Sequence, residues 1–133
     1  MLGYRVRESK EYDIITKIVS ASHLILGGFI VIKFATEITP EAVQFIHENI
    51  KWVGTLESIR HERHRRKMYY KTIFTGSDKT LEIYSGITSG YVGAGPDGFY
   101  KVLVELGVAE EIAKKEVYEA GEEEYEFEIF LGN

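Results

Sequence analysis

The chain has 133 residues, of which 44% are hydrophobic and 28% charged, and its formal net charge is −5 at pH 7. This length and composition predict one globular domain over residues 1–133 and exclude a disordered chain. The sequence contains no cysteine, which excludes disulfides, thiolate nucleophiles and zinc–thiolate sites.

The N-terminal segment alternates charged and apolar residues and lacks the apolar core of a secretion signal. The longest apolar stretch, residues 24–32, is about half the length that a bilayer-spanning helix needs. We therefore expect a cytoplasmic protein with no membrane contact. Eighteen glutamates stand against one glutamine and two asparagines, which is typical of heat-adapted proteins. We expect a thermophilic source and a homo-oligomer.

The first part of the chain predicts a short strand, a helix and a β-hairpin. Residues 3–8 alternate apolar and charged side chains, as a strand does. Residues 10–21 place isoleucine and valine at helical spacing. Residues 23–26 and 29–34 flank a Gly-Gly pair and are expected to form a hairpin.

The clearest helix begins at Thr39 and Pro40. We expect the threonine hydroxyl to cap free N–H groups, and proline suits the first helical turn because it has no N–H to leave unpaired. Apolar residues then recur on one face until Gly54 ends the helix.

The middle of the chain predicts strands. Residues 55–62 fit either a helix or a strand. A period-two pattern then predicts one strand over residues 63–75, which the turn at 76–79 joins to a second strand at 80–85.

Two helices and a strand are predicted last, over about 97–107, 109–119 and 123–131. This mixture, with hairpins prominent, predicts the α+β class. We expect a single domain with a mostly antiparallel sheet and three to four helices packed on it. The order of the strands does not follow from the sequence.

A run of cations occupies residues 60–71, which hold six Lys or Arg against one Glu. On a single strand, alternate members of this run would share one face. These members are Arg63, Arg65, Lys67, Tyr69 and Lys71. A basic face with an aromatic ring among the charges is one way of binding single-stranded nucleic acid.

The acidic C-terminal strand offers a simpler explanation of these cations. Alternate residues from 122 to 128 are glutamates, whereas Tyr125, Phe127 and Ile129 belong to the other face. Neighbouring strands of opposite charge neutralise each other. Residues 105–128 hold ten Glu and two Lys, a net charge of −8, which would repel phosphates. Nucleic-acid binding is thus an alternative, and pairing of the two strands would count against it.

The loop at residues 86–98 contains five glycines in thirteen positions. Glycine loses more entropy on ordering than any other residue, and long loops are disfavoured in heat-stable proteins, so we expect this loop to have a function. The N-terminus of the following helix would offer N–H groups to a phosphate or carboxylate. The candidate ligand-binding residues are Thr88, Ser89, Tyr91, Gly93, Gly95 and Gly98.

Three of these glycines satisfy the pattern G-x-G-x-x-G. In dinucleotide-binding domains that pattern follows the first strand of a βαβ unit. Here Pro96 and Asp97 fill the variable positions, and no parallel strand follows a single crossover. We therefore reject a dinucleotide site and expect no cofactor. The alternative is that the glycines only allow positive φ angles and a close approach to the sheet.

No motif assigns catalytic residues, because nucleophile-elbow, P-loop and S-x-x-K patterns are all missing from the sequence. If residues 57–64 were helical, Glu57, His61 and His64 would share a face, but the neighbouring arginines oppose a cation and we expect no metal. If the loop were an enzyme site, Tyr91, His61 or His64 would carry the proton.

The sequence therefore predicts a non-catalytic binding module. Its contact surface would be the loop at 86–98 and the helix N-terminus that follows, and its ligand a small anion or a protein partner. Two alternatives stay open: a nucleic-acid-associated protein that uses residues 63–71, and a small enzyme acting at the glycine-rich loop.

Overall fold

A computed structural model of the chain describes residues 2–7, 22–26 and 29–132, with side chains over 30–132. The helix expected over residues 10–21 lies outside this part. The described strands and α-helices are β1 (Leu2–Arg7), β2 (Ser22–Leu26), β3 (Phe29–Ala35), α1 (Thr39–Asn49), β4 (Leu56–His64), β5 (Tyr69–Gly76), β6 (Lys79–Tyr84), α2 (Ala94–Glu105), α3 (Glu110–Lys114) and β7 (Glu124–Leu131). Short helical turns occur at Ile50–Val53, Arg65–Lys67 and Lys115–Glu119.

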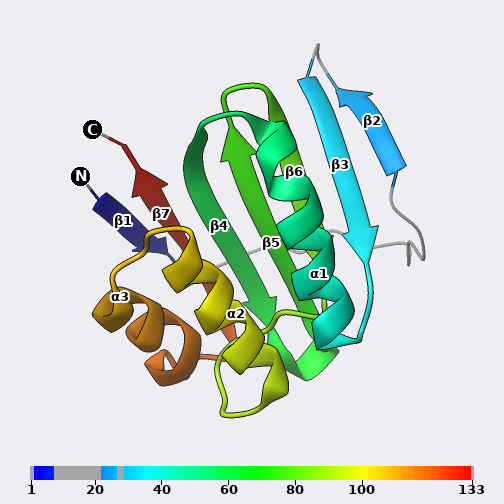
Figure 1. The fold of residues 1–133 in the computed structure, drawn as a ribbon. Helices are drawn as coiled ribbons and strands as arrows, with labels where there is room; N and C mark the ends of the chain where they lie inside the picture. Colours follow the sequence, from blue (N-terminus) through cyan, green and yellow to red (C-terminus); the bar gives the residue numbers. More distant parts are fainter. Residues whose placement is uncertain (1, 8–21, 27–28, 133) are drawn as a thin grey trace.

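The seven described strands form one sheet in the order β1-β7-β4-β5-β6-β3-β2 (Figure 1). Neighbours run antiparallel, except that β3 and β6 are parallel. The α+β class and the mostly antiparallel sheet are confirmed. The sheet is nevertheless mixed. The described part of the chain holds three α-helices, where three to four were expected.

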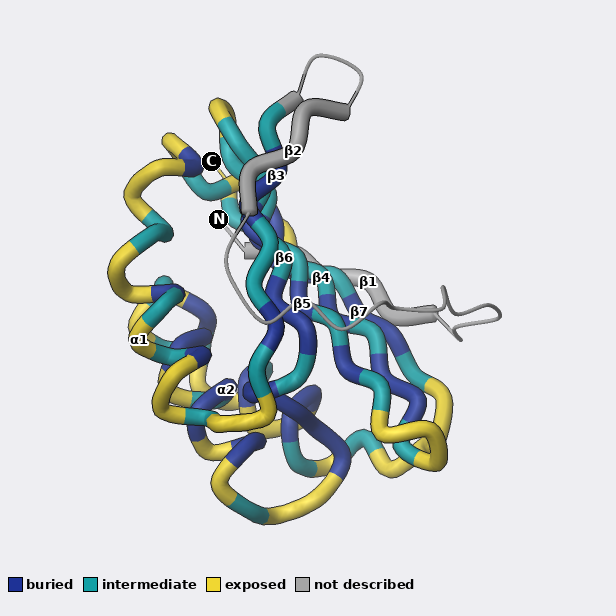
Figure 2. Tube along the Cα trace, turned by 90° about the vertical axis from the view of Figure 1, so that its right-hand side faces the viewer, coloured by how far each residue is buried: buried dark blue, intermediate teal, exposed yellow. Residues whose placement is uncertain are grey.

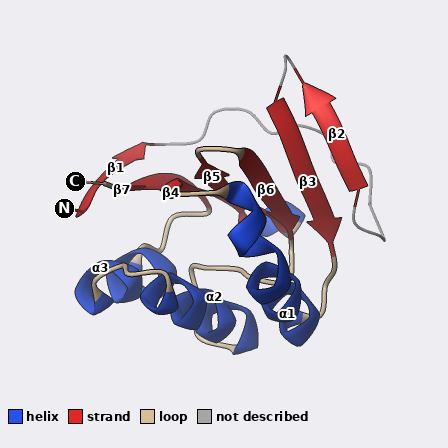
Figure 3. Cartoon of the chain, turned by 45° about the horizontal axis from the view of Figure 1, so that its top comes forward, coloured by secondary structure: helices blue, strands red, loops and turns tan. Residues whose placement is uncertain are grey.

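The helices cover one face of the sheet (Figures 2 and 3). Strand residues alternate between this face and the opposite one because successive side chains of a strand point to opposite sides. Buried residues of the strands meet buried residues of the helices in one core, which includes Ile59, Phe74, Leu81, Ile83, Phe127, Ala42, Ile46, Phe99 and Leu103. The core holds α1 and α2 against the centre of the sheet.

The start of α1 differs from the expectation. Pro40 lies in the first turn as predicted, but the residue that precedes the helix is Ile38 and no side chain caps it. The hydroxyl of Thr39 instead donates to the carbonyl of Gly86, at 2.7 Å. Thr39 therefore ties the start of α1 to the loop that follows β6.

The predicted strand over residues 63–75 is wrong. β4 ends at His64, the chain turns through Arg65–Lys67, and β5 begins at Tyr69. Met68 makes this reversal possible with a left-handed φ of 53°. The sequence pattern concealed the turn because both strands have period two, and three consecutive cations fit an exposed hairpin tip as well as one face of a strand.

The acidic strand β7 pairs with β4, the strand that holds the first part of the basic run. Glutamates of β7 alternate with buried Phe127 and Ile129, as expected. Arg60 of β4 forms ion pairs with Glu126 at 3.0 Å and with Glu62 at 3.2 Å. Arg60 thus offsets part of the negative charge that Glu62 of β4 and Glu126 of β7 place on the face opposite the helices.

Candidate functional site

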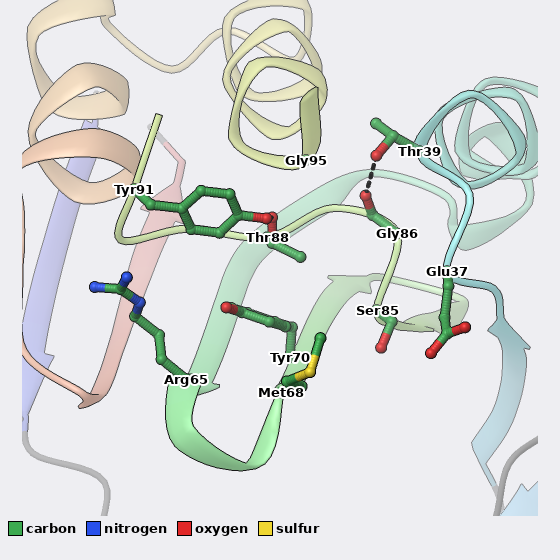
Figure 4. A pocket seen from close by; sticks show the side chains of 10 residues that line it. All are labelled: Glu37, Thr39, Arg65, Met68, Tyr70, Ser85, Gly86, Thr88, Tyr91 and Gly95. Atoms are coloured by element: carbon green, nitrogen blue, oxygen red, sulfur yellow. Dashed lines mark hydrogen bonds between the residues drawn. The ribbon is translucent and has the colours of Figure 1, made fainter. Parts of the chain in front are cut away.

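The parallel pairing of β3 and β6 places two strand ends at one edge of the sheet. From this edge the chain leaves β3 to enter α1, and it leaves β6 to enter α2. In sheets that contain such β–α connections, ligands bind outside the carboxyl ends of the strands. The tip of the β4–β5 hairpin lies at the same edge (Figure 4).

A cleft of about 590 Å³ opens at this edge (Figure 4). Three segments far apart in the sequence line it: the β3–α1 connection, the β4–β5 hairpin and the loop after β6. The lining residues are Glu37, Thr39, Arg65, Met68, Tyr70, Ser85, Gly86, Thr88, Tyr91 and Gly95.

Residues with strained backbone conformations line the cleft. In the described part of the chain, the non-glycine residues with positive φ are Met68, at 53°, and Ser85, at 62°, and both line the cleft. Gly86 follows with a φ of 73°, and the N–H of Ile87 donates to the carbonyl of Ser85 at 2.8 Å, which closes a three-residue turn. Left-handed conformations of residues other than glycine cost about 1–3 kcal/mol and occur preferentially at functional sites.

The cleft carries one cation and one anion among its lining residues. The Arg65 guanidinium lies over the Tyr91 ring, 5.8 Å from its centroid. Within the residues that the structure describes, no carboxylate oxygen lies within 4 Å of that guanidinium. Glu37 lies on the opposite side of the cleft (Figure 4). Between them, burial raises the pKa of the Tyr70 phenol above its usual value.

Helix α2 begins at Ala94, earlier than the expected start near Asp97. Its first turn approaches the cleft closely at Gly95, where a Cβ atom would lie 2.0 Å from the Thr88 hydroxyl oxygen. That hydroxyl is hydrogen-bonded to the Tyr91 hydroxyl at 2.7 Å. The Asp97 carboxylate instead accepts from Tyr118 at 2.5 Å; burial and this hydrogen bond raise the pKa of Tyr118 to about 12.

A buried polar network lies behind the cleft. The His61 ring is fully buried, and its Nδ1 and Nε2 atoms each lie 2.8 Å from a hydroxyl, of Thr72 and Ser89 respectively. Burial, aided by the positive charge of Arg63, holds the pKa of His61 well below its usual value. His61 is therefore neutral at physiological pH.

The second member of this network is the fully buried Arg63. Its guanidinium donates to the Ser89 hydroxyl at 2.9 Å and to the carbonyls of Ala120 and Glu122, each at 2.7 Å. The Gly90 N–H donates to the Val117 carbonyl at 2.7 Å. The loop after β6 is thus fixed to the segment that links α3 with β7.

The sequence-predicted ligand residues separate into two groups. Thr88, Tyr91 and Gly95 line the cleft. Ser89 belongs to the buried network, and Gly93 precedes α2. Gly98 belongs to α2 and faces α1, where a Cβ atom would be 2.5 Å from the Thr39 methyl carbon. These three residues shape the loop and its helix contacts and do not line the cleft.

The five residues expected on a basic face do not share one. Arg63 is buried beneath the helices, Arg65 lines the cleft and Lys67 is exposed in the hairpin turn. The Lys71 ammonium lies 5.6 Å from the Tyr84 ring centroid on the opposite face of the sheet. Tyr69 precedes Lys71 by two residues and is half-buried.

Sequence reasoning missed six lining residues: Glu37, Thr39, Met68, Tyr70, Ser85 and Gly86. The β5–β6 hairpin brings Met68 and Tyr70 to Ser85 and Gly86, whereas Glu37 and Thr39 join them because β3 and β6 are neighbours, a pairing that no local pattern indicates. The available signals were polar residues after β3, at Thr36 and Glu37, and a glycine-rich loop after β6. They point to this edge only when the strand order is known.

The helical arrangement considered for Glu57, His61 and His64 is wrong, because these residues belong to the strand β4. In the described residues, no group of three or more His, Asp or Glu side chains is arranged to hold a metal ion. None of the described helices combines the length and apolar character that crossing a bilayer requires.

No protein-family model matches the chain, and no match was found among curated proteins or among solved structures.

Proposed function

We propose that this protein is a non-catalytic binding module whose cleft, at the ends of β3 and β6, holds a small anionic ligand. The observation that carries the proposal is the Arg65 guanidinium on the wall of a cleft of about 590 Å³, where no described carboxylate lies within 4 Å of it. A guanidinium binds phosphates and carboxylates through paired hydrogen bonds. Hydroxyl groups of Ser85, Thr88 and Tyr91 supply further partners.

The strained backbone supports a binding role for this cleft. Met68 and Ser85 both have left-handed φ angles at the wall. Strain of this kind persists when the surrounding structure fixes the residue and the geometry serves a function. Thr39, which links α1 to Gly86, helps to fix it here.

The titratable groups support binding over catalysis. The proton carriers considered for an enzyme were His61, His64 and Tyr91, and the imidazole of His61 is fully buried with both nitrogens engaged. A general acid or base works best when its pKa lies near the ambient pH. Burial holds the pKa of His61 well below its usual value, and it raises the pKa of Tyr70 in the cleft further above the ambient pH.

Composition alone supports three further proposals, a thermophilic source, a cytoplasmic location and self-association. The cleft would serve a protein partner equally well if the anion were a side chain of that partner.

The proposal is tested by titrating the ¹⁵N-labelled protein with inorganic phosphate at constant ionic strength and recording amide chemical shifts. We expect saturable shifts at Gly86, Thr88 and Gly95. Arg65→Gln should weaken binding about tenfold or more, because it removes charge-assisted hydrogen bonds. Arg66→Gln removes the same charge from the exposed neighbour in the same turn and should change binding less than about twofold. Equal losses in both variants, or no saturable shift, would contradict the proposal.

A further inference from the structure

The cleft is larger than a simple anion needs. Its volume of about 590 Å³ falls within the range of pockets that hold drug-sized molecules. The guanidinium of Arg65 would contact only the charged group of such a ligand, and the rest of the ligand would meet the other lining residues. The chemistry of these residues therefore indicates what the body of the ligand is.

Aromatic and thioether side chains lie beside the guanidinium. The β4–β5 hairpin supplies Arg65, Met68 and Tyr70, and the loop after β6 supplies Tyr91, whose ring centroid is 5.8 Å from the guanidinium. Figure 4 shows these four side chains grouped together, with Glu37 across the cleft from them. The surface next to the cation is thus apolar and largely aromatic, and it continues directly from the group that would bind an anion.

Met68 combines two unfavourable features at the wall of the cleft. Its φ of 53° is left-handed, and 77% of its surface is exposed. Glycine or asparagine would form the same turn with less strain and without exposing apolar surface. A ligand that covers the methionine side chain would offset this cost, because burying apolar surface stabilises a complex.

Resting on the proposed function, we infer that the ligand carries its anionic group on an aromatic ring. The anionic group binds Arg65, and the ring packs against Met68 and the two tyrosine rings. All of these neighbours favour an aromatic body over an aliphatic one. A guanidinium stacks on aromatic faces, a thioether sulfur makes favourable contacts with aromatic rings, and pairs of rings attract each other beyond the area that they bury.

The test compares inorganic phosphate, cyclohexyl phosphate and phenyl phosphate, which share one anionic group. They are titrated into the ¹⁵N-labelled protein at constant ionic strength and at about pH 8, where each is mainly doubly charged. Phenyl phosphate should bind about tenfold or more tightly than inorganic phosphate, because its ring buries apolar surface. It should bind about threefold more tightly than cyclohexyl phosphate, whose ring is similar in size but makes no aromatic contacts.

The methyl group of Met68 reports where the ring lies. The sequence holds two methionines, Met1 and Met68, so labelling methionine methyl groups gives at most two signals, and Met68→Ser identifies the signal of Met68. Phenyl phosphate should shift this signal through its ring current, and cyclohexyl phosphate should shift it much less.

Met68→Ser should reduce the advantage of phenyl phosphate over inorganic phosphate about threefold or more, because it removes the thioether contact. Val92→Ser truncates another exposed apolar residue, 83% exposed, which is not among those that line the cleft, and it should keep the advantage. Equal losses in the two variants would overturn this placement of the ring.

The three phosphates also separate this inference from the proposed function on which it rests. If phenyl phosphate binds no more tightly than inorganic phosphate, or if cyclohexyl phosphate matches it, the aromatic inference is overturned while the anion site stands. If none of the three binds, the proposed function is overturned as well.

Discussion

Which atoms carry the protons in the buried network of His61 and Arg63 depends on the groups around Ser89. Arg63 can only donate hydrogen bonds, so the Ser89 oxygen accepts from it, and the single Ser89 proton is available to Nε2 of His61. If Ser89 gives this proton to Nε2, the neutral imidazole carries its own proton on Nδ1 and donates it to Thr72. A Ser–His contact of 2.8 Å, which elsewhere activates a nucleophile, here serves structure because both side chains are fully buried.

His61 should make the protein sensitive to acid. The unfolded chain binds a proton at this histidine below about pH 6.5, whereas the folded protein, in which burial lowers the pKa, does not. The free energy of unfolding therefore falls as the pH drops below about 6.5, by up to about 1.4 kcal/mol per pH unit from this group. We expect urea denaturation of His61→Gln to show a shallower loss of stability than the unaltered protein between about pH 6.5 and 5.

Glutamine offers a donor and an acceptor to Thr72 and Ser89 but does not titrate, so the comparison isolates the proton. Parallel pH profiles for the two proteins would show that the buried imidazole does not control acid stability. The m-values of the two proteins should agree, which would confirm that both unfold to the same extent.

At the scale of elements, the loop after β6 is shaped by where its glycines lie. Gly90 has a φ of 91°, and a Cβ atom there would lie 2.9 Å from the central guanidinium carbon of Arg63. Gly107, after α2, has a φ of 101° with no atom within 4 Å of such a Cβ. Gly121 has neither constraint. The three positions therefore separate backbone strain from steric contact.

We expect alanine substitutions at these glycines to destabilise the protein in a graded series. Gly121→Ala should be within about 0.5 kcal/mol of the unaltered protein, and Gly107→Ala should lose about 1 kcal/mol through its left-handed backbone. Gly90→Ala should lose about 2 kcal/mol or more, because it combines this strain with displacement of a buried guanidinium. Chemical denaturation measures all three, and equal losses at Gly90 and Gly107 would contradict the role given to Arg63.

Several secondary-structure elements could be predicted from signals within their own stretch of sequence. The hairpin of β5 and β6, the end of α2 at Gly107 and the strand β7 followed from turn residues and periodicity, and the structure confirms them. The turn at Met68, which separates β4 from β5, did not follow from the sequence, because a residue other than glycine adopts a φ of 53° there. The entropy lost on ordering its glycines predicts that the loop at 86–98 is functional, and three of its six candidate residues line the cleft.

The remaining part of the site depends on the arrangement of the whole chain. Glu37 and Arg65 come from segments that strand pairing alone brings to one edge, and the parallel contact of β3 with β6 has no signature within either strand. The charge pattern of the basic run and the acidic strand was informative in a different way. It indicated that the two segments are neighbours, and β7 does pair with residues 60–64 of the run in β4, whereas residues 69–71 belong to β5, which is not a neighbour of β7.

The distribution of charge over the molecule leads us to expect little affinity for nucleic acid. The net charge is −5, and the five residues expected on one basic face do not share a face. A fluorescence-anisotropy titration with labelled single-stranded and duplex oligonucleotides at about 50 mM salt should show no saturable binding. Saturable binding that weakens steeply at about 200 mM salt, and that Arg65→Ala/Lys67→Ala/Lys71→Ala removes, would restore the nucleic-acid alternative.

The order of strands also governs how quickly this sheet can assemble. β4, β5 and β6 are consecutive hairpin partners and can meet early, because closing a short loop loses little entropy. β4 acquires its second neighbour only from β7, and β6 only from β3, both distant in the sequence. Folding rates fall as such non-local pairings dominate. Until they form, both edges of the central three-stranded meander stay open to other chains, so refolding yield should depend on protein concentration.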